Sequence, residues 1–219
     1  MDYQHKPADY FGHARTDVLQ LLKGKSGLAL LELGAGGGFT LAEAKNRGLA
    51  AYVAGVELFT IDNSFQKNPL LDEFHFADLN QGLTELKRKD FDAILCLDVL
   101  EHLTDPWAVL DRWAPCLKKD GLLLISIPNF REFTVMWKIF FRGDFGYTAD
   151  GILDKTHLRF FTRKTLYGLP PATHFRNIRV VPAIRYQKAG LFRTWFNRLT
   201  FGLFEDFLTV QWFVLAEKS

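Results

Sequence analysis

The sequence predicts an α/β fold in which helices cover both faces of a mostly parallel sheet. Between residues 28 and 128, short and almost continuously apolar runs alternate with helical patterns. Strands that are apolar on both faces are typical of a parallel sheet that is covered on each side. The first apolar run also ends in a glycine-rich turn that leads straight into a helix, in the stretch LLELGAGGGFT. These two observations predict a Rossmann-like, doubly wound domain whose ligand binds beyond the carboxyl ends of the strands.

The same patterns place strands and helices along the chain. Strands are expected at Leu28–Leu33, Ala50–Glu57, Phe74–Asp78, Phe91–Asp98, Leu122–Pro128, Ile178–Ala183 and Val210–Ala216. Helices are expected at Ala8–Lys23, Phe39–Gly48, Pro106–Leu117, Arg131–Arg142 and Lys164–Tyr167. Because no linker or low-complexity tract interrupts the pattern, we expect residues 1–219 to form a single domain. Insertions are expected near residues 129–165 and 186–208.

The composition is that of an ordinary globular protein. Hydrophobic residues make up 48% and charged residues 24% of the 219 residues, which argues against disorder. The formal net charge of +2 gives the whole molecule no strong field that would attract nucleic acid. The two cysteines, Cys96 and Cys116, lie in an expected strand and at an expected helix end, which favours a reducing compartment. With no signal-peptide or transmembrane pattern, we expect a cytoplasmic protein.

Acidic residues stand at the carboxyl ends of the first four expected strands. They are Glu32, Glu57, Asp78 and Asp98. The carboxyl ends of parallel strands meet at one edge of the sheet, where ligands of such folds bind. Unpaired carboxylates are costly to bury in a core. We therefore interpret the four acids as parts of one binding site rather than as helix caps or solvated loop residues.

The spacing of the glycines distinguishes two classes of ligand. A dinucleotide site needs glycines at the first, third and sixth positions of the turn. Counting from Gly34, the third position is Gly36 but the sixth is Phe39, so the close approach of a pyrophosphate is not indicated. Glu32, just ahead of the turn, would repel a pyrophosphate. It suits a ligand that carries an ammonium and a sulfonium group, as S-adenosylmethionine does.

At these residues the chain resembles the class I S-adenosylmethionine-dependent methyltransferases. The resemblance covers most of the chain and rests on five motifs in order: Glu32–Gly38, Glu57, Asp78, Phe91–Asp98 and Gly121–Pro128. It implies a seven-stranded mixed sheet in the order 3-2-1-4-5-7-6 with strand 7 antiparallel. It further implies S-adenosylmethionine as cofactor. The residues that it implies for cofactor binding are Glu32, Gly34, Ala35, Gly36, Gly38, Glu57, Leu58, Asp78, Leu79 and Asp98.

Two histidines are the candidate catalytic residues. His102 follows the fourth strand, at the ligand-binding edge of the sheet, and histidine titrates in the range useful for proton transfer. His157 lies in a segment, Thr156–Arg163, that resembles a His-Leu-Arg-Phe-Phe-Thr element of bacterial methyltransferases. Those enzymes act in cell-surface polysaccharide, lipid and small-molecule pathways. We expect His102 to be a general base and His157 to lie at the acceptor; the alternative is that each only anchors a loop.

A metal-assisted reaction is a second interpretation of the same region. Asp98, Glu101, His102 and His157 resemble in spacing the set that holds Mg²⁺ in small-RNA 3′-end 2′-O-methyltransferases. Here Asp98 replaces a longer glutamate and the later segment has a single histidine. The chain also shows no strongly basic surface for RNA. We therefore expect no metal and no nucleic-acid partner, and keep metal-assisted 2′-O-methylation of RNA ends as an alternative.

Aromatic residues late in the chain form an amphipathic stripe. In Gly190–Leu208 the apolar positions recur at helical spacing: Phe192, Trp195, Phe196, Leu199 and Leu203. The foremost interpretation is that the stripe covers the sheet or forms a lid. The alternatives are the face of a homodimer and a helix that lies on a membrane surface, since Trp, Phe and Arg suit the headgroup boundary. Arg131–Arg142 could extend the same surface.

The leading functional hypothesis is methylation of a hydroxyl or amine on a small molecule, a sugar or a lipid-linked intermediate. Two other classes compete with it. An NAD-dependent oxidoreductase is disfavoured by the missing sixth-position glycine. A non-catalytic cofactor-binding partner subunit is disfavoured by the acids at all four strand ends.

Overall fold

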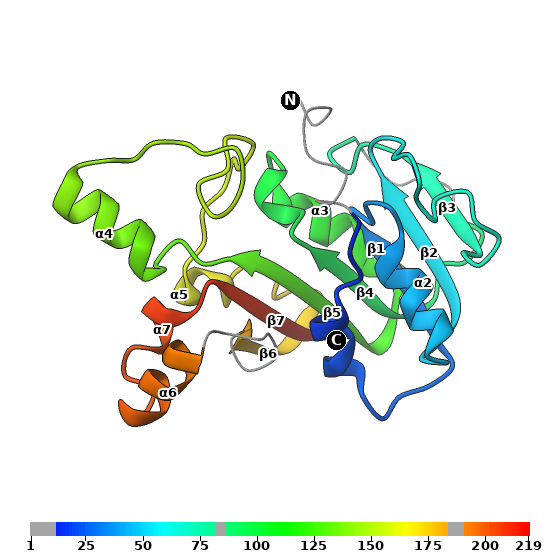
Figure 1. Cartoon of the computed structure of the whole chain (residues 1–219). Helices are drawn as coiled ribbons and strands as arrows, with labels where there is room; N and C mark the ends of the chain where they lie inside the picture. Colours follow the sequence, from blue (N-terminus) through cyan, green and yellow to red (C-terminus); the bar gives the residue numbers. More distant parts are fainter. Residues whose placement is uncertain (1–11, 82–85, 184–190) are drawn as a thin grey trace.

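The computed structural model describes residues 12–81, 86–183 and 191–219, and within them the strands form one seven-stranded sheet (Figure 1). The strand order is β3-β2-β1-β4-β5-β7-β6. Neighbouring strands pair in parallel, except that β7 is antiparallel to both β5 and β6. The expected order and the antiparallel seventh strand are confirmed. The strands are β1 Leu28–Leu33, β2 Ala50–Glu57, β3 Glu73–Phe76, β4 Phe91–Leu97, β5 Leu117–Pro128, β6 Phe175–Pro182 and β7 Gln211–Lys218.

Helices pack on both faces of this sheet and explain why the central strands β1, β2 and β4 are almost continuously apolar. On one face, Val18 of α1 (Thr16–Leu19) and Leu41 of α2 (Phe39–Asn46) are buried with Leu30 of β1. On the other face, Trp113 of α3 (Pro106–Trp113) is buried with Ile94 of β4. The helix α5 (Arg163–Leu166) contributes to this second core. Strands between two such layers have no face that water reaches.

The opening helix is much shorter than the sequence predicts. A helix was expected over Ala8–Lys23, but α1 begins at Thr16, continues as a 3-10 turn (η3, Gln20–Leu22) and ends there. Residues 12–15 are not helical, and residues 8–11 lie outside the described part of the chain. The backbone N–H of Arg15 donates to Thr40 Oγ1 at 3.2 Å, and its side chain pairs with Asp98 at the far end of β4. These contacts hold the segment against the sheet edge instead of in a helix.

The aromatic segment after β6 forms two short helices rather than one. Helix α6 (Leu191–Leu199) and helix α7 (Glu205–Leu208) are separated at Phe201 and Gly202, which both have positive φ, +50° and +79°. Trp195, Leu199 and Leu203 are exposed, so the interpretation that they cover the sheet is wrong for these side chains. The side chain of Phe192 lies outside the described part of the structure. A two-helix arrangement was not apparent from the sequence because helical spacing alone does not reveal a left-handed residue.

Helix α4 (Phe133–Arg142) confirms the helix expected over Arg131–Arg142 and leaves most of its apolar side chains exposed. Glu132 caps its first turn, accepting from Thr134 N at 2.7 Å, and Val135 is its buried side chain. Figure 1 shows α4 and α6 at the same end of the molecule, beyond the β5 and β7 strands. An ion pair between Arg193 of α6 and Glu132, 2.8 Å long, joins the two helices.

Candidate active site

A cleft of about 740 Å³ opens at the carboxyl ends of the central strands. It is the place where the doubly wound topology predicts a ligand. Of the residues predicted to bind the cofactor, nine line it: Glu32, Gly34, Ala35, Gly36, Glu57, Leu58, Asp78, Leu79 and Asp98. Both predicted catalytic histidines, His102 and His157, line the same cleft. The cofactor end and the histidine end therefore share one continuous space.

Gly38 is the one predicted cofactor residue that does not line the cleft. It caps α2 in the left-handed conformation, with φ +76°. A Cβ added there would lie 2.8 Å from Cδ2 of Leu71, so the position requires glycine for packing and backbone conformation. Its place in the glycine motif is therefore explained by the turn rather than by contact with the ligand.

The glycine turn is held tightly against its neighbours. Gly34 has φ +71°, and a Cβ added there would lie 2.4 Å from Cγ2 of Val99. The N–H groups of Gly34 and Ala35 both donate to the Val56 carbonyl, at 2.9 and 3.0 Å. Buried Gln66 donates to the Gly36 carbonyl at 2.9 Å. These contacts fix the backbone of the Gly34–Gly36 turn, against which a ligand would bind.

Glu57, at the end of β2, is tied to the same turn. Its carboxylate accepts from the N–H of Gly36 at 2.8 Å and from that of Leu58 at 2.6 Å. Burial raises the pKa of Glu57, and the backbone hydrogen bonds oppose that increase. The carboxylate still borders the cleft, so its remaining lone pairs can accept hydrogen bonds from hydroxyl groups of a ligand.

Glu32 is almost fully buried beneath the glycine turn. Its Oε2 has no hydrogen-bond partner within the described residues. Burial raises the pKa of Glu32 to about 8; the charge of Arg15 opposes the shift and that of Glu57 adds to it. The charge of Arg15 does not offset the cost of burial, and a positively charged ligand in the cleft would further favour the ionised carboxylate.

Asp98 is engaged by side chains from three distant parts of the chain. It pairs with Arg15, accepts a hydrogen bond from Gln211, and accepts one from Ser126 Oγ at 3.2 Å. Burial by itself would lower the pKa of Arg15, but its pairing with Asp98 and Asp17 outweighs that and raises the pKa. The acid at the end of β4 is therefore charge-compensated, in contrast to Glu32.

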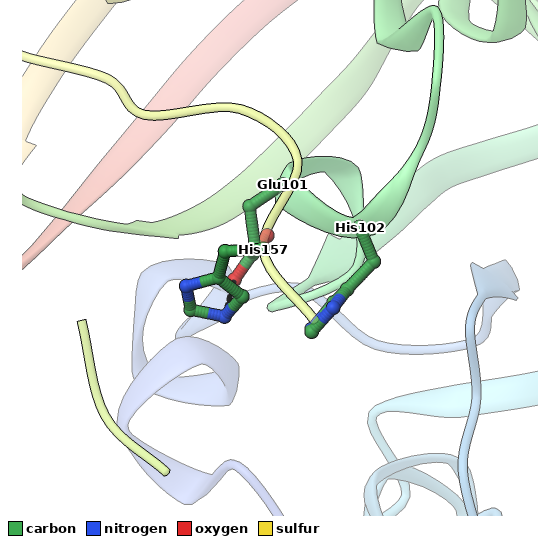
Figure 2. Close-up of side chains that lie close together, drawn as sticks. All are labelled: Glu101, His102 and His157. Atoms are coloured by element: carbon green, nitrogen blue, oxygen red, sulfur yellow. Dashed lines mark ion pairs between the residues drawn. The ribbon is translucent and has the colours of Figure 1, made fainter. Parts of the chain in front are cut away.

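The two histidines meet over a buried carboxylate. The rings of His102 and His157 lie 4.6 Å apart between centroids in an edge-to-face arrangement. His157 Nε2 lies 3.9 Å from Oε1 of Glu101, which is 1% exposed. Figure 2 shows that Glu101 and His102 project from the turn after β4 (η4, Leu100–His102), and that His157 approaches from the opposing segment. Burial raises the pKa of Glu101 well above its ordinary value, and the charge of Asp98 adds to the shift.

Comparison with known sequences decides the family. A sequence model of the methyltransferase domain family matches residues 3–180. The chain belongs to this family. The resemblance to class I S-adenosylmethionine-dependent methyltransferases is thereby confirmed, and S-adenosylmethionine is the cofactor of this class.

Curated relatives and solved structures agree with this assignment. The chain is 31% identical over 133 residues to the ubiquinone biosynthesis O-methyltransferase of Actinobacillus pleuropneumoniae, covering 57% of this chain and 56% of the relative. It is 32% identical over 108 residues to the enzyme of the same name from Neisseria meningitidis, covering 47% and 45%. The chain thus spans about half the length of the curated relatives it matches. An S-adenosylmethionine-dependent methyltransferase of Archaeoglobus fulgidus has the same fold, with a TM-score of 0.64 over 100% of both chains at 17% identity.

The methyltransferase cleft fits a ligand of this kind. Glu32 provides a buried carboxyl group whose ionised form a cationic group would stabilise, and Glu57 provides acceptors for hydroxyl groups. The absence of a Cβ at Gly34 leaves room where a side chain would collide with Val99. These residues would hold S-adenosylmethionine, which would supply a methyl group activated by its sulfonium charge.

Several residues that line or support this methyltransferase cleft were missed by sequence reasoning. Arg15 was placed inside a helix, Gln66 and Gln211 lay outside every motif, and Ser126 lay within Gly121–Pro128 without a role of its own. Arg15 donates to both Ser126 and Gln211 at 3.1 Å, so the three form one polar cluster around Asp98. The spacing of the four proposed metal-binding residues also proved partly misleading, because Asp98 is not part of the Glu101, His102 and His157 group.

Proposed function

We propose that this methyltransferase domain transfers the methyl group of S-adenosylmethionine to a hydroxyl of an acceptor with a large apolar part. The observation that carries the proposal is the continuity of the cleft. One end has Glu32, Glu57 and the glycine turn, and the other has His102 and His157. A donor and an acceptor can thus lie in one space, and holding two reactants in line supplies much of the rate enhancement of such a displacement.

His102 is the residue best placed to accept the hydroxyl proton. Its Nδ1 lies 3.2 Å from the Thr156 carbonyl oxygen and 3.1 Å from Thr156 Oγ1. Thr156 Oγ1 donates its own hydrogen to Asp154 Oδ1 at 2.8 Å, so both groups can only accept from His102. The proton of the neutral ring therefore resides on Nδ1, and the basic lone pair is on Nε2. A hydroxyl acceptor would deliver its proton there as the new C–O bond forms.

The choice of a hydroxyl, and of an apolar acceptor, rests on two observations. The curated relatives are named O-methyltransferases. At the histidine end, the cleft wall contains apolar side chains: Leu103, Pro128, Ile152 and Val210. Such a wall favours an acceptor whose reactive hydroxyl is attached to an apolar body.

A direct test measures cofactor binding and product formation separately. We expect calorimetry to show one site for S-adenosylmethionine and none for NAD. Methyl transfer is then assayed with a panel of phenolic, sugar and amine acceptors that carry or lack an alkyl chain. His102→Ala should lower turnover at least about 100-fold with the cofactor affinity unchanged. Failure to bind S-adenosylmethionine would overturn the proposal, and cofactor binding with transfer to none of the acceptors would favour a non-catalytic partner subunit.

We further propose that the acceptor comes from an anionic lipid surface. Exposed apolar side chains gather on α4, α6 and the turn that follows: Phe133, Trp137, Phe140, Phe141, Trp195, Leu199, Phe201 and Leu203. In this aromatic surface Phe140 is 77% and Trp195 is 61% exposed. The same helices carry basic side chains among these aromatic ones: Lys138 and Arg142 on α4, and Arg198 on α6. Aromatic and basic side chains in this mixture suit the headgroup boundary of anionic membranes.

Peripheral binding, rather than insertion, is the geometry that this surface supports. Among the described residues, no helix is long and apolar enough to cross a membrane. Helix α4 spans ten residues and α6 nine, too short for the hydrocarbon core. The two helices could instead lie on the surface side by side, joined by the Arg193–Glu132 pair.

Vesicle sedimentation tests this surface. We expect the protein to bind vesicles that contain phosphatidylglycerol more strongly than vesicles of phosphatidylcholine alone. Trp195→Glu and Phe140→Glu should each weaken that binding, whereas Phe76→Glu on β3, an aromatic that is 45% exposed at the other end of the sheet, should not. No vesicle binding by the wild type, together with a dimer that Trp195→Glu dissociates, would assign the surface to a second copy of the chain instead.

A further inference from the structure

Glu101 is a buried carboxylate that the proposed proton transfer does not use. Its side chain is 1% exposed, and neither carboxylate oxygen has a hydrogen-bond partner in the described part of the structure. It nevertheless borders the cleft. A buried carboxylate without a partner is destabilising by several kcal/mol, roughly, so such a residue usually accompanies a cation or a proton.

The two histidines beside Glu101 present lone pairs rather than protons. His157 Nδ1 lies 2.9 Å from the Ile152 carbonyl oxygen, which can only accept, so its ring proton is on Nδ1. The same argument from Thr156 assigns the His102 proton to Nδ1. In both neutral rings the basic nitrogen is Nε2, and for His157 this is the atom that faces Glu101 at 3.9 Å. Three electron-pair donors thus converge at one point of the cleft.

The group is built from two segments that the backbone ties together. The N–H groups of Leu158 and Arg159 both donate to the Glu101 carbonyl, at 2.8 and 3.0 Å. This fixes the segment that carries His157 against the turn that carries Glu101 and His102. One ligand atom from each of the three residues lies within 4.8 Å of the others. Donors on one ion at about 2.1 Å lie roughly 3 to 3.5 Å apart, so small side-chain rotations would complete the site.

We propose that Glu101, His102 and His157 bind a divalent transition-metal ion, with its remaining positions open to the cleft. Two imidazoles and one carboxylate suit Zn²⁺ and its neighbours in the first transition row better than Mg²⁺, which prefers an all-oxygen shell. Histidine ligands commonly donate their second N–H to a backbone carbonyl or a carboxylate-linked group. Ile152 and the Thr156–Asp154 pair occupy those positions here.

Such an ion would change the role of His102. It would bind the acceptor oxygen and lower the pKa of that hydroxyl, and the Nε2 lone pair of His102 would serve as a ligand instead of as the base. This catalytic use rests on the proposed function. The binding of the ion does not, because its three ligands and their supports belong to the protein alone.

Cobalt(II) is the probe for this site, because its visible absorption reports nitrogen and oxygen ligands directly. The chelator-treated protein is titrated with Co²⁺ and then with Zn²⁺ in competition. We expect one Co²⁺ per chain, with binding at least about tenfold weaker in Glu101→Gln and in His157→Gln. His174→Gln is the matched control, since His174 lies at the surface beside Asp111 at 3.1 Å. No absorption band, or equal binding by all four proteins, would overturn the proposal.

Thermal unfolding distinguishes the loss of a metal ligand from a general loss of folding. In chelator, Glu101→Gln should unfold at about the same temperature as the wild type, because neither carboxyl oxygen of Glu101 has a hydrogen bond to lose within the described residues. Added Zn²⁺ should raise the melting temperature of the wild type but not of the variant. A variant that melts lower in chelator would assign Glu101 a purely structural role. Calorimetry with S-adenosylmethionine on the same proteins keeps the result separate from the proposed function, since cofactor binding should be equal in both.

Discussion

Arg15, in the segment that precedes α1, forms an ion pair with Asp98, which lies 83 positions later at the end of β4. The pair joins the start of the chain to the centre of the cleft. It also separates the roles of two neighbouring acids, because Asp98 is compensated by a cation whereas Glu32 is not. The cleft therefore has, in Glu32, a buried carboxyl group without an ion-pair partner, and a positively charged ligand would favour its ionised form.

Arg15→Met should lower the free energy of unfolding by about 1–3 kcal/mol. The substitution leaves Asp98 without its cation in a partly buried position, where the loss of one partner costs more than at the surface. Urea unfolding of Arg15→Met, Asp98→Asn and the double variant provides a double-mutant cycle. We expect the double variant to be more stable than the sum of the single effects predicts. Strictly additive losses would mean that the two side chains are not coupled.

Glu57→Ala should weaken S-adenosylmethionine binding by about tenfold or more. The substitution removes acceptors for the ligand and also the hydrogen bonds that hold the Gly36 and Leu58 N–H groups. A hydrogen bond to a charged group contributes about 1.5–3 kcal/mol. Calorimetry measures the effect, and Glu43→Ala on the exposed face of α2 is the control. An unchanged affinity in Glu57→Ala would show that the carboxylate does not contact the cofactor.

The stability of the cofactor-free protein should fall as the pH rises from about 5 to 9. The pKa of Glu32 is about 8 in the folded protein, above its ordinary value of 4.5. The protonated group therefore favours the folded state, and this stabilisation is complete below pH 4.5 and lost as the pH rises through 8. The change is on the order of 4 kcal/mol at about 1.4 kcal/mol per pKa unit.

Glu32→Gln provides the reference for that pH dependence. The variant retains every other titratable group. The difference in melting temperature between the two proteins therefore reports the contribution of Glu32 alone to the pH dependence of stability. We expect the wild type to lose stability relative to Glu32→Gln between pH 5 and 9, and S-adenosylmethionine to reduce this loss by placing a cation nearby. Parallel pH profiles of the two proteins would show that Glu32 is ionised throughout.

Gly34→Ala should destabilise the protein more than Gly24→Ala. Both glycines have positive φ, +71° and +87°, so each substitution incurs a similar backbone penalty of about 1 kcal/mol. At Gly34 the new Cβ would also lie 2.4 Å from Val99, whereas nothing lies within 4 Å of it at Gly24. Overpacking of this kind costs about 1–3 kcal/mol more. Equal losses in thermal unfolding would show that Val99 moves aside freely.

The parts of this protein that could be predicted from sequence are those that depend on neighbours in the chain. The apolar runs of β1, β2 and β4 need only short-range patterning to be recognised. The turn at Gly34 can be recognised from its glycines in the sequence, because few residues other than glycine adopt positive φ readily. Resemblance to the methyltransferase class then supplied the strand order, including the antiparallel β7, which no local pattern specifies.

Contacts between distant segments required the folded chain. Nothing near Arg15 in the sequence indicates that its guanidinium pairs with Asp98 instead of continuing a helix. The amphipathic pattern around Trp195 shows that one face is apolar, but whether another element covers that face depends on the whole arrangement. Here Trp195, Leu199 and Leu203 stay exposed, whereas Phe196 is partly covered. The same holds for Glu101, whose neighbour His157 is brought against it by backbone hydrogen bonds from a segment more than fifty residues away. Short-range sequence determines backbone conformation, whereas long-range packing determines which charges are compensated and which are left in the cleft.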